Sequence, residues 1–247
     1  MDYSKKCRSK YTPEKWKYIN QYYCRSWVSW VGRHTNTAIA EDRNKQRNCN
    51  ITSEYIMNLL KKQNYLCAVS GIELRHDKSL YSMSIDRLNN KLGHIQGNVQ
   101  LISRGLNLAK NDGKQENLID LLDNLMSNSF EPEKKSRDYI SSRIRMHKMR
   151  DTKHGLDCDI STDMILDLYN RTDGRCYFTN IKMACYKHSC FSISIDRMDN
   201  TKGHTIDNVR LVLKSINRAK RDYDDENFSS WLDDIRESYQ RKQYGFS

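Results

Sequence analysis

Two stretches of the chain carry nearly the same pattern of hydrophobic and polar residues. The segment SIDRLNNKLGHIQGNVQLISRGLNLAK covers residues 84–110, and residues 194–220 match it at 13 of 27 positions. Its later apolar residues are spaced three, four and three apart, which predicts one face of a helix beginning near Val99. This face consists of Val99, Ile102, Leu106 and Ala109, and in the second copy of Val209, Val212, Ile216 and Ala219.

Strands are predicted in front of this helix. MSID in the first copy and ISID in the second alternate apolar and polar residues, which is typical of strands. A turn rich in Asn, Lys and Gly follows, and a second strand is expected to run from His94 or His204. A further strand is expected through Cys67 and Cys176.

Helices are predicted at the start of each copy. Thr52 and Ser161 are suited to cap a short helix, because each has a hydroxyl and an acidic residue two positions later. Basic helices are expected at about 14–32 and 136–150. The sequence therefore predicts a mixed α+β protein.

The repeat extends well beyond the two quoted segments. CNITSEYIMNLL from Cys49 parallels CDISTDMILDLY from Cys158, and NDGKQENLIDLLDNLM parallels RDYDDENFSSWLDDIR downstream. A unit of roughly a hundred residues in two copies indicates a tandem duplication rather than a solenoid. We expect an N-terminal unit at 1–127, a polar linker at 128–136 and a C-terminal unit at 137–247.

Charge and cysteine usage narrow the class of protein. Lys and Arg number 42 against 31 Asp and Glu, a net charge of +11, which favours a polyanionic partner. No apolar run is long enough to span a membrane, and MDYSKKCRSK lacks the apolar region of a signal peptide. The eight cysteines form no CxxC pair. We therefore expect an intracellular protein with reduced thiols, in the cytoplasm or nucleoid of its host, or in a nucleus or organelle if eukaryotic, and not a secreted one.

The repeated polar residues predict a small site in each copy. Strand, turn, strand and helix would bring four of them together: Asp86, His94, Asn107 and Lys110, and in the second copy Asp196, His204, Asn217 and Lys220. Carboxylate and amide oxygens suit Mg²⁺ or Mn²⁺, and a histidine is a suitable base for activating water. The alternative interpretation is that the Asp and Asn residues only form turns and caps.

The motif D-R-x-x-N-x-x-G-H-x-x-x-N-V followed by N-x-A-K resembles the core of the HNH, or ββα-metal, nuclease family. CAVSGIEL and CYFTNIKM resemble the strand that often precedes this core. The resemblance is to phage and intron-borne, homing-type members, and it covers about residues 50–126 and 159–236. It implies two tandem ββα-metal units, each with a preceding basic helix and a following amphipathic helix.

The resemblance also implies roles for individual residues. Asp86 and Asn107 would hold the metal, Asn98 would brace the loop, and Lys110 would lie near the phosphate. Asp196, Asn217, Asn208 and Lys220 would do the same in the second unit.

One position departs from the commonest family pattern. Arg87 and Arg197 stand where a histidine usually follows the aspartate, and arginine is a poor base because it stays protonated. His94 and His204 are the candidate bases. The alternative is that these histidines are structural and bonded to the loop, in which case a metal-bound hydroxide could act without a side-chain base.

Two further sets of residues concern nucleic-acid binding and zinc binding. Basic side chains on the two predicted helices are expected to contact nucleic acid, positioning the protein without specifying sequence: Lys15, Lys17, Arg25, Arg33, Arg143, Arg145, Lys148 and Arg150. Zinc is not expected, because the spacings of Cys176, Cys185, His188 and Cys190 are irregular.

These features predict a Mg²⁺-dependent DNA endonuclease, homing-type or encoded by a phage or virus. Two sites in one chain would cut both strands of double-stranded DNA in a monomer with internal pseudo-symmetry. The alternatives are a nucleic-acid-binding protein that keeps the scaffold without cleaving, and a nickase with one working site.

Overall fold

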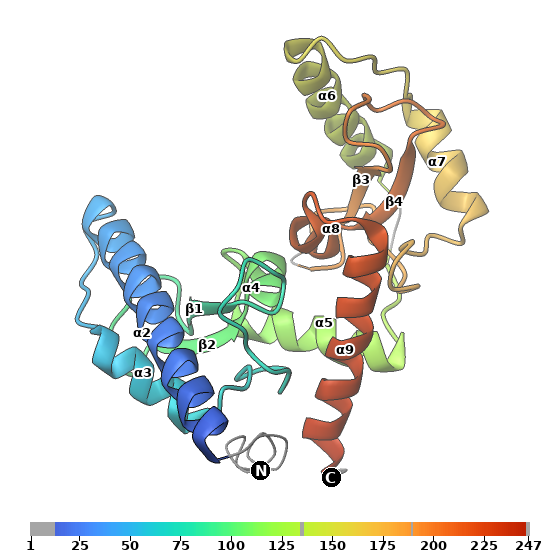
Figure 1. Ribbon diagram of the computed structural model, residues 1–247. Coiled ribbons are helices and arrows are strands. Elements are labelled where there is room, and N and C mark those ends of the chain that lie inside the picture. The colour runs from blue at the N-terminus through green and yellow to red at the C-terminus, as the bar shows by residue number, and fades with distance from the viewer. Residues whose placement is uncertain (1–12, 134–135, 189, 246–247) are drawn as a thin grey trace. The chain divides into compact units, whose positions relative to one another are not determined.

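The chain is a mixed α+β protein, which confirms the predicted class. The computed structural model describes residues 13–133, 136–188 and 190–245, and within it the side chains of residues 13–25 are not described. The described residues form eight helices and two sheets, each sheet of two antiparallel strands (Figure 1). None of the described helices is both long and apolar enough to cross a membrane.

The first copy of the repeat begins with a long helix and has its strands in the middle. The helix α2 packs against α3 and β1, and α3 packs against β2. The two strands pair so that Asp86 lies opposite Gln100. The elements are α2 (Pro13–Asn44), α3 (Ser53–Lys62), β1 (Met83–Arg87), β2 (Val99–Ser103), α4 (Arg104–Lys110) and α5 (Gln115–Ser127).

The second copy has the same order of elements. The helix α6 packs against α7, and α8 packs against both β3 and β4. Here Asp196 lies opposite Arg210 across the strand pair. The elements are α6 (Arg137–Lys153), α7 (Thr162–Arg171), β3 (Ile193–Arg197), β4 (Val209–Leu213), α8 (Lys214–Lys220) and α9 (Asp225–Tyr244).

The local signals for helix starts and first strands are confirmed. Thr52 accepts a hydrogen bond from the Tyr55 backbone N–H at 3.1 Å, and Ser161 accepts one from the Met164 N–H at 3.2 Å. These hydroxyls satisfy donors that the first turn of a helix leaves unpaired. MSID and ISID lie in β1 and β3, and the helices expected near 14–32 and 136–150 correspond to α2 and α6.

Two boundaries and one strand were predicted wrongly in each copy. The second strand begins at Val99 rather than His94, and the helix begins at Arg104 rather than near Val99; the second copy departs in the same way. All five residues of β2 are buried, and all pair with β1, so sheet pairing decides the conformation of a short apolar run whose spacing also fits a helix. Cys67 and Cys176 lie outside the strands, each directly before a tight turn.

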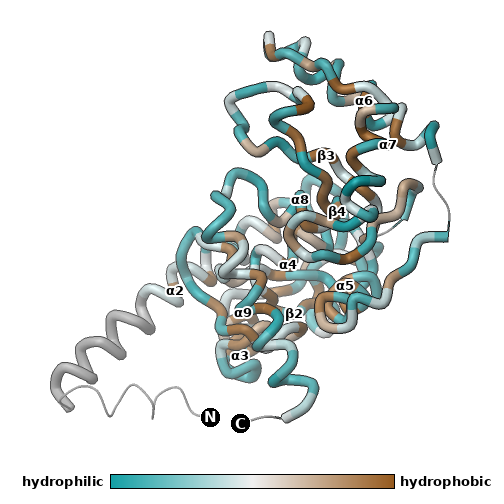
Figure 2. Tube along the Cα trace, turned by 90° about the vertical axis from the view of Figure 1, so that its right-hand side faces the viewer, coloured by the Kyte–Doolittle hydropathy of each residue, from teal (hydrophilic) through white to brown (hydrophobic). Residues whose placement is uncertain are grey.

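The core of each half is centred on its strand pair. Leu101 and Ile102 of β2 are fully buried, as are Val212 and Leu213 of β4. Figure 2 shows the trace of β3 and β4 as hydrophobic, whereas the loop between these strands is mostly hydrophilic. Each buried strand pair thus anchors a polar loop.

Contacts divide the chain into two compact units. One consists of Met1–Asn107 with Glu237–Ser247, and the other of Leu108–Arg236. The domain limits 1–127 and 137–247 follow the sequence repeat instead and stay a prediction.

Candidate functional site

A cavity of about 330 Å³ in the second copy brings several predicted residues together. Asp196, His204 and Asn217 all line it, although they lie on β3, in the following loop and on α8. Three arginines, Arg150, Arg197 and Arg221, also line it. The cavity therefore combines oxygen donors, an imidazole and positive charge. We call this set of residues the second site, and Asp86, His94 and Asn107 with their neighbours the first site.

The strand pair holds the aspartate of each site. Asp86 is 3 % exposed, and its Oδ2 accepts a hydrogen bond from Gln100 Nε2 at 2.8 Å. Asp196 is 6 % exposed, and its Oδ2 accepts from Arg210 Nε at 2.9 Å. Each aspartate is thus oriented by the residue that faces it across the sheet.

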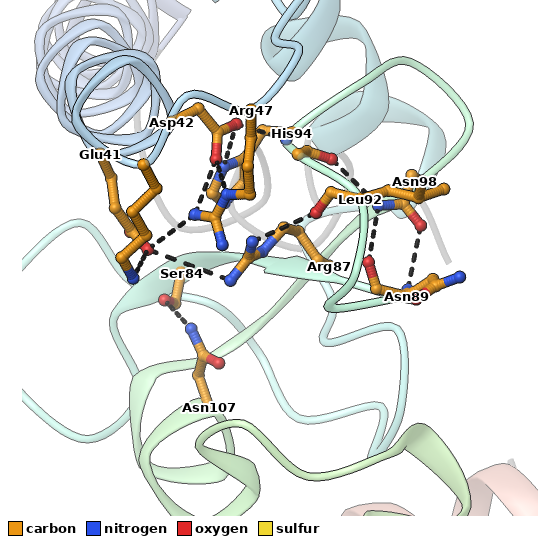
Figure 3. Close-up of polar contacts among 12 residues, drawn as sticks. Glu41, Asp42, Arg47, Ser84, Arg87, Asn89, Leu92, His94, Asn98 and Asn107 are labelled. Atoms are coloured by element: carbon orange, nitrogen blue, oxygen red, sulfur yellow. Dashed lines mark hydrogen bonds and ion pairs between the residues drawn. The ribbon is translucent and has the colours of Figure 1, made fainter.

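The helix after the second strand holds the asparagine. Asn107 Nδ2 donates to Ser84 Oγ at 2.7 Å, as Figure 3 shows, and Asn217 Nδ2 donates to Ser194 Oγ at 2.9 Å. Because the amide nitrogen is engaged in this bond, the carbonyl oxygen Oδ1 is the atom suited to bind a cation. The serines two residues before the aspartates therefore position the asparagines.

Each histidine is paired with a buried aspartate at the end of a basic helix. Asp42 of α2 lies 2.9 Å from His94 Nδ1 and accepts the backbone N–H of His94 at 2.5 Å (Figure 3). Asp151 of α6 lies 2.7 Å from His204 Nδ1 and accepts its backbone N–H at 2.8 Å. A carboxylate accepts, so Nδ1 carries the proton of the neutral ring and Nε2 is left as the basic nitrogen.

Burial and neighbouring charges set the proton affinity of the second pair. Burial lowers the pKa of His204, as do the charges of Arg197 and Arg150, against the opposite effect of Asp151. Burial would raise the pKa of Asp151, but its bonds from the backbone and ring of His204 outweigh this, and the pKa is below its usual range. The imidazole is therefore neutral, and Asp151 is ionised, near neutral pH.

The glycine before each histidine is required by close packing. A Cβ on Gly93 would lie 2.0 Å from the carbonyl oxygen of Asn48, and a Cβ on Gly203 would lie 1.7 Å from that of Asp157. Real Cβ atoms do not approach a backbone oxygen this closely. Glycine therefore lets the loop pack against the segment that follows the basic helix, and the next residue, the histidine, can reach the aspartate near the end of that helix.

Asparagine and arginine close the loop between the strands. Asn98 accepts from the Asn89 N–H at 2.9 Å and donates to the carbonyls of Asn89 and Gly93, and Asn208 makes the same three bonds in the second copy. Arg87 Nη1 donates to the Leu92 carbonyl at 3.2 Å. Arg197 Nη1 donates to the Lys202 carbonyl at 2.8 Å. These contacts fit the loop-bracing role that the resemblance implies for the asparagines, and they give the arginines a similar role.

The two lysines of the motif are buried. Lys220 is 3 % exposed, forms an ion pair with Asp225 at 3.5 Å and does not line the cavity. Lys110 is 5 % exposed. Burial of the ammonium groups gives neither lysine the accessible position expected of a phosphate contact.

The residues expected to bind nucleic acid differ in placement. Arg145, Lys148 and Arg150 are exposed on α6, and Arg33 is exposed on α2 with its guanidinium 5.3 Å from the centre of the Trp30 ring. Arg143 is half-buried. The side chains of Lys15, Lys17 and Arg25 lie outside the described residues.

Asp42 and Asp151 are the site residues that sequence reasoning missed. A signal was present: each stands seven residues before a repeated cysteine, Cys49 or Cys158, in a stretch where the copies otherwise differ. The pairing itself joins residues more than 50 positions apart, which no local pattern reveals.

Residues of the described chain do not gather three or more His, Cys, Asp and Glu side chains into a metal-binding group. A site with one carboxylate and one amide oxygen is of a different type. Of the cysteines considered for zinc, Cys176, Cys185 and Cys190 are buried.

Comparison with known proteins gives no further guidance. No protein-family model, no curated protein and no solved structure matches the chain.

Proposed function

We propose that the protein is a Mg²⁺-dependent DNA endonuclease with two HNH-like ββα-metal sites in one chain. The observation that carries this proposal is the cavity lined by Asp196, His204 and Asn217 together with three arginines. An oxygen-donor pair, a neutral imidazole and fixed positive charge can together support phosphodiester hydrolysis, as metal ligands, base and phosphate contacts.

The donor pair fits a hard divalent cation. Asp196 and Asn217 line one cavity, and the bond of the Asn217 amide nitrogen to Ser194 leaves its oxygen for a cation. Asp86 and Asn107 have the same supports in the first site. When bound, Mg²⁺ or Mn²⁺ would stabilise the charge that develops on the phosphate and on the leaving oxygen.

The histidines are the groups that would accept a proton from water. The Asp42–His94 and Asp151–His204 pairs orient each ring and stabilise its protonated form, as an aspartate does for the base in serine hydrolases. His204 reaches the cavity wall with Nδ1 already engaged. His94 and His204 would thus serve as bases in place of the histidine that usually follows the aspartate, where this chain has Arg87 and Arg197.

Positive charge would bind the DNA backbone. Arg150 and Arg221 line the second cavity, and Arg145 and Lys148 extend the charge along α6. Phosphate contacts of this kind give affinity that falls steeply as salt rises. With two sites in one chain, a monomer would cut both strands of double-stranded DNA.

Cleavage of a supercoiled plasmid tests this proposal. With Mg²⁺, the wild type should give linear product, Asp86→Ala and Asp196→Ala should each give nicked circles, and the double variant should leave the plasmid intact. Chelation of the metal should stop all cleavage. Circular dichroism should establish that each variant is folded.

A binding protein without cleavage is the second candidate. Arg87 and Arg197 favour this candidate, because they stand where the commonest relatives have a histidine base. In each of them a guanidinium nitrogen donates to a loop carbonyl, which is a structural role. Tight, salt-sensitive binding with an uncut plasmid would support this candidate, and nicked circles from the wild type would indicate a single working site.

A further inference from the structure

The two sites differ at positions that face the same groups. The aspartate, histidine and asparagine are identical in both copies, but the residue opposite the aspartate is Gln100 in the first site and Arg210 in the second. The residue before the buried aspartate of the helix is Glu41, half-buried, in the first copy and Arg150, exposed, in the second. Both differences make the second site more positive.

Arg210 is fixed against the carboxylate of the second site. Its Nε donates to Asp196 at 2.9 Å, and its two terminal nitrogens donate to Asp225 at the start of α9. Its guanidinium also lies 4.6 Å from the centre of the Tyr177 ring and 4.5 Å from that of Phe178. Arg210 is 6 % exposed, so these contacts place a full charge, poorly screened, beside Asp196.

The first copy lacks each component of this arrangement. Gln100 donates to Asp86 at 2.8 Å through a neutral amide. The repeat places Gln115 where Asp225 stands, and it places Ala68 and Val69 where the two aromatic rings stand. All four positions differ between the copies, so the contacts of Arg210 with Asp225 and with the two rings have no counterpart in the first copy.

The positions of Arg210 and Asp225 decide the net electrostatic effect at the carboxylate of Asp196. Arg210 lies between Asp196 and Asp225, so its positive charge is nearer to the candidate ligand than the compensating negative charge of Asp225. Coulomb energy falls with distance, and the nearer charge therefore dominates at the ligand oxygen.

The rim of the site changes in the same direction. Arg150 lines the second cavity. Glu41 lies 4.0 Å from Arg87 in the first site, where it also pairs with Lys45 at 2.9 Å and with Arg47 at 3.1 Å (Figure 3). Lys45 and Arg47 partly neutralise Glu41 in the first site. The second site has the positive charge of Arg150 at the position of Glu41, so its rim is the more positive of the two.

We propose that the second site binds a divalent cation less tightly than the first, because Arg210 and Arg150 hold positive charge around Asp196. This inference rests on the proposed function, since it concerns the same metal sites. The first site then fills at low metal concentration and nicks one strand, and the second site fills at higher concentration and completes the double-strand break. The phosphate of the substrate, by contrast, meets more positive charge at the second site.

Binding of Mn²⁺, followed by electron paramagnetic resonance, measures the two sites separately. The Asp86→Ala variant retains the second site, and Asp196→Ala retains the first. We expect the Kd for Mn²⁺ to be about tenfold higher or more at the second site, which corresponds to one nearby charge in a partly screened setting.

Exchanging residues between the copies tests the cause. In the Asp86→Ala background, Arg210→Gln with Asp225→Gln should lower the Kd about tenfold. Arg150→Glu changes an exposed residue whose guanidinium contacts His147 Nδ1 at 3.0 Å. This variant should also lower the Kd, and it keeps the test valid if the buried Arg210–Asp225 pair proves necessary for folding. Arg171→Gln is the matched control, because it removes one positive charge from an exposed ion pair on α7 and should leave the Kd unchanged.

The outcomes separate the inference from the proposed function. Equal affinities at the two sites, or no response to Arg150→Glu and to the double exchange in folded protein, would overturn the inference and leave a two-site nuclease standing. Failure of both single variants to bind Mn²⁺ would overturn the inference together with the metal sites.

Discussion

The loop 87–98 and the loop 197–208 differ at seven of 12 positions, yet they make the same hydrogen bonds. In both, an asparagine closes the loop, an arginine bonds a carbonyl five residues on, and a histidine reaches an aspartate on a basic helix. Around the candidate metal ligands the reverse holds, since Gln100 and Arg210 differ in charge at one register position. The architecture of the two sites is thus shared, and their electrostatics are not.

The largest effect is expected from substitutions that disturb the architecture shared by the two loops. Gly203→Ala should destabilise the second copy by about 3 kcal/mol or more, because its Cβ would overlap the Asp157 carbonyl. Hydrogen exchange should show faster opening in 193–213 than in 83–103, and Gly93→Ala should give the mirror result. Gly32→Ala is the control, since nothing lies within 4 Å of that Cβ and alanine favours a helix. Unchanged protection in both glycine variants would contradict the packing argument.

How far the sequence predicted this structure depends on whether a signal is local. The sequence predicts the caps at Thr52 and Ser161 and the strands MSID and ISID, because a hydroxyl cap and the alternation of apolar and polar residues act within a few residues. The sequence predicts a helix over VQLIS because the apolar residues of so short a segment fit the period of a helix as well as that of a strand, and only pairing with β1 decides between them.

The candidate site divides in the same way. The motif spacing brought Asp196, His204 and Asn217 to one cavity, as expected from strand, loop and helix. The burial of Lys220 and the partner of each histidine depend on contacts between distant segments, so the sequence did not predict them.

A smaller effect is expected in how the stability of the two copies depends on pH. His147 packs its ring 4.1 Å from that of His204, whereas Ala38 stands at the equivalent position of the first copy. Burial, the charge of His204 and Arg150 lower the pKa of His147 to about 3. The unfolded chain binds a proton near pH 6.5 and the folded chain does not, so stability is present above pH 6.5 and is lost as pH falls toward 3.

Between pH 8 and pH 5 this histidine should cost the second copy about 2 kcal/mol of unfolding free energy. Urea unfolding at the two pH values, followed by hydrogen exchange in 193–213, measures the loss. His147→Ala should remove most of it. An acid-dependent loss of the same size in that variant would show that another group is responsible.

The smallest effect concerns the basic helix α6. Lys148→Ala should weaken DNA binding on every sequence alike and reduce the slope of log K against log salt by about 0.9, the value for one phosphate contact. Fluorescence anisotropy over a salt series measures this slope. Lys61→Ala, an exposed lysine on α3, is the control. Equal slopes for both variants would show that α6 does not contact the phosphates.

Mapping the nicked strand is the most direct test of the central claim that the chain holds two separate cutting sites. Plasmid nicked by Asp86→Ala and plasmid nicked by Asp196→Ala are each sequenced by primer extension on both strands. We predict nicks on one strand for the first variant and on the complementary strand, opposite those nicks, for the second. Nicks on the same strand for both variants, or cleavage that neither substitution changes, would contradict the two-site account.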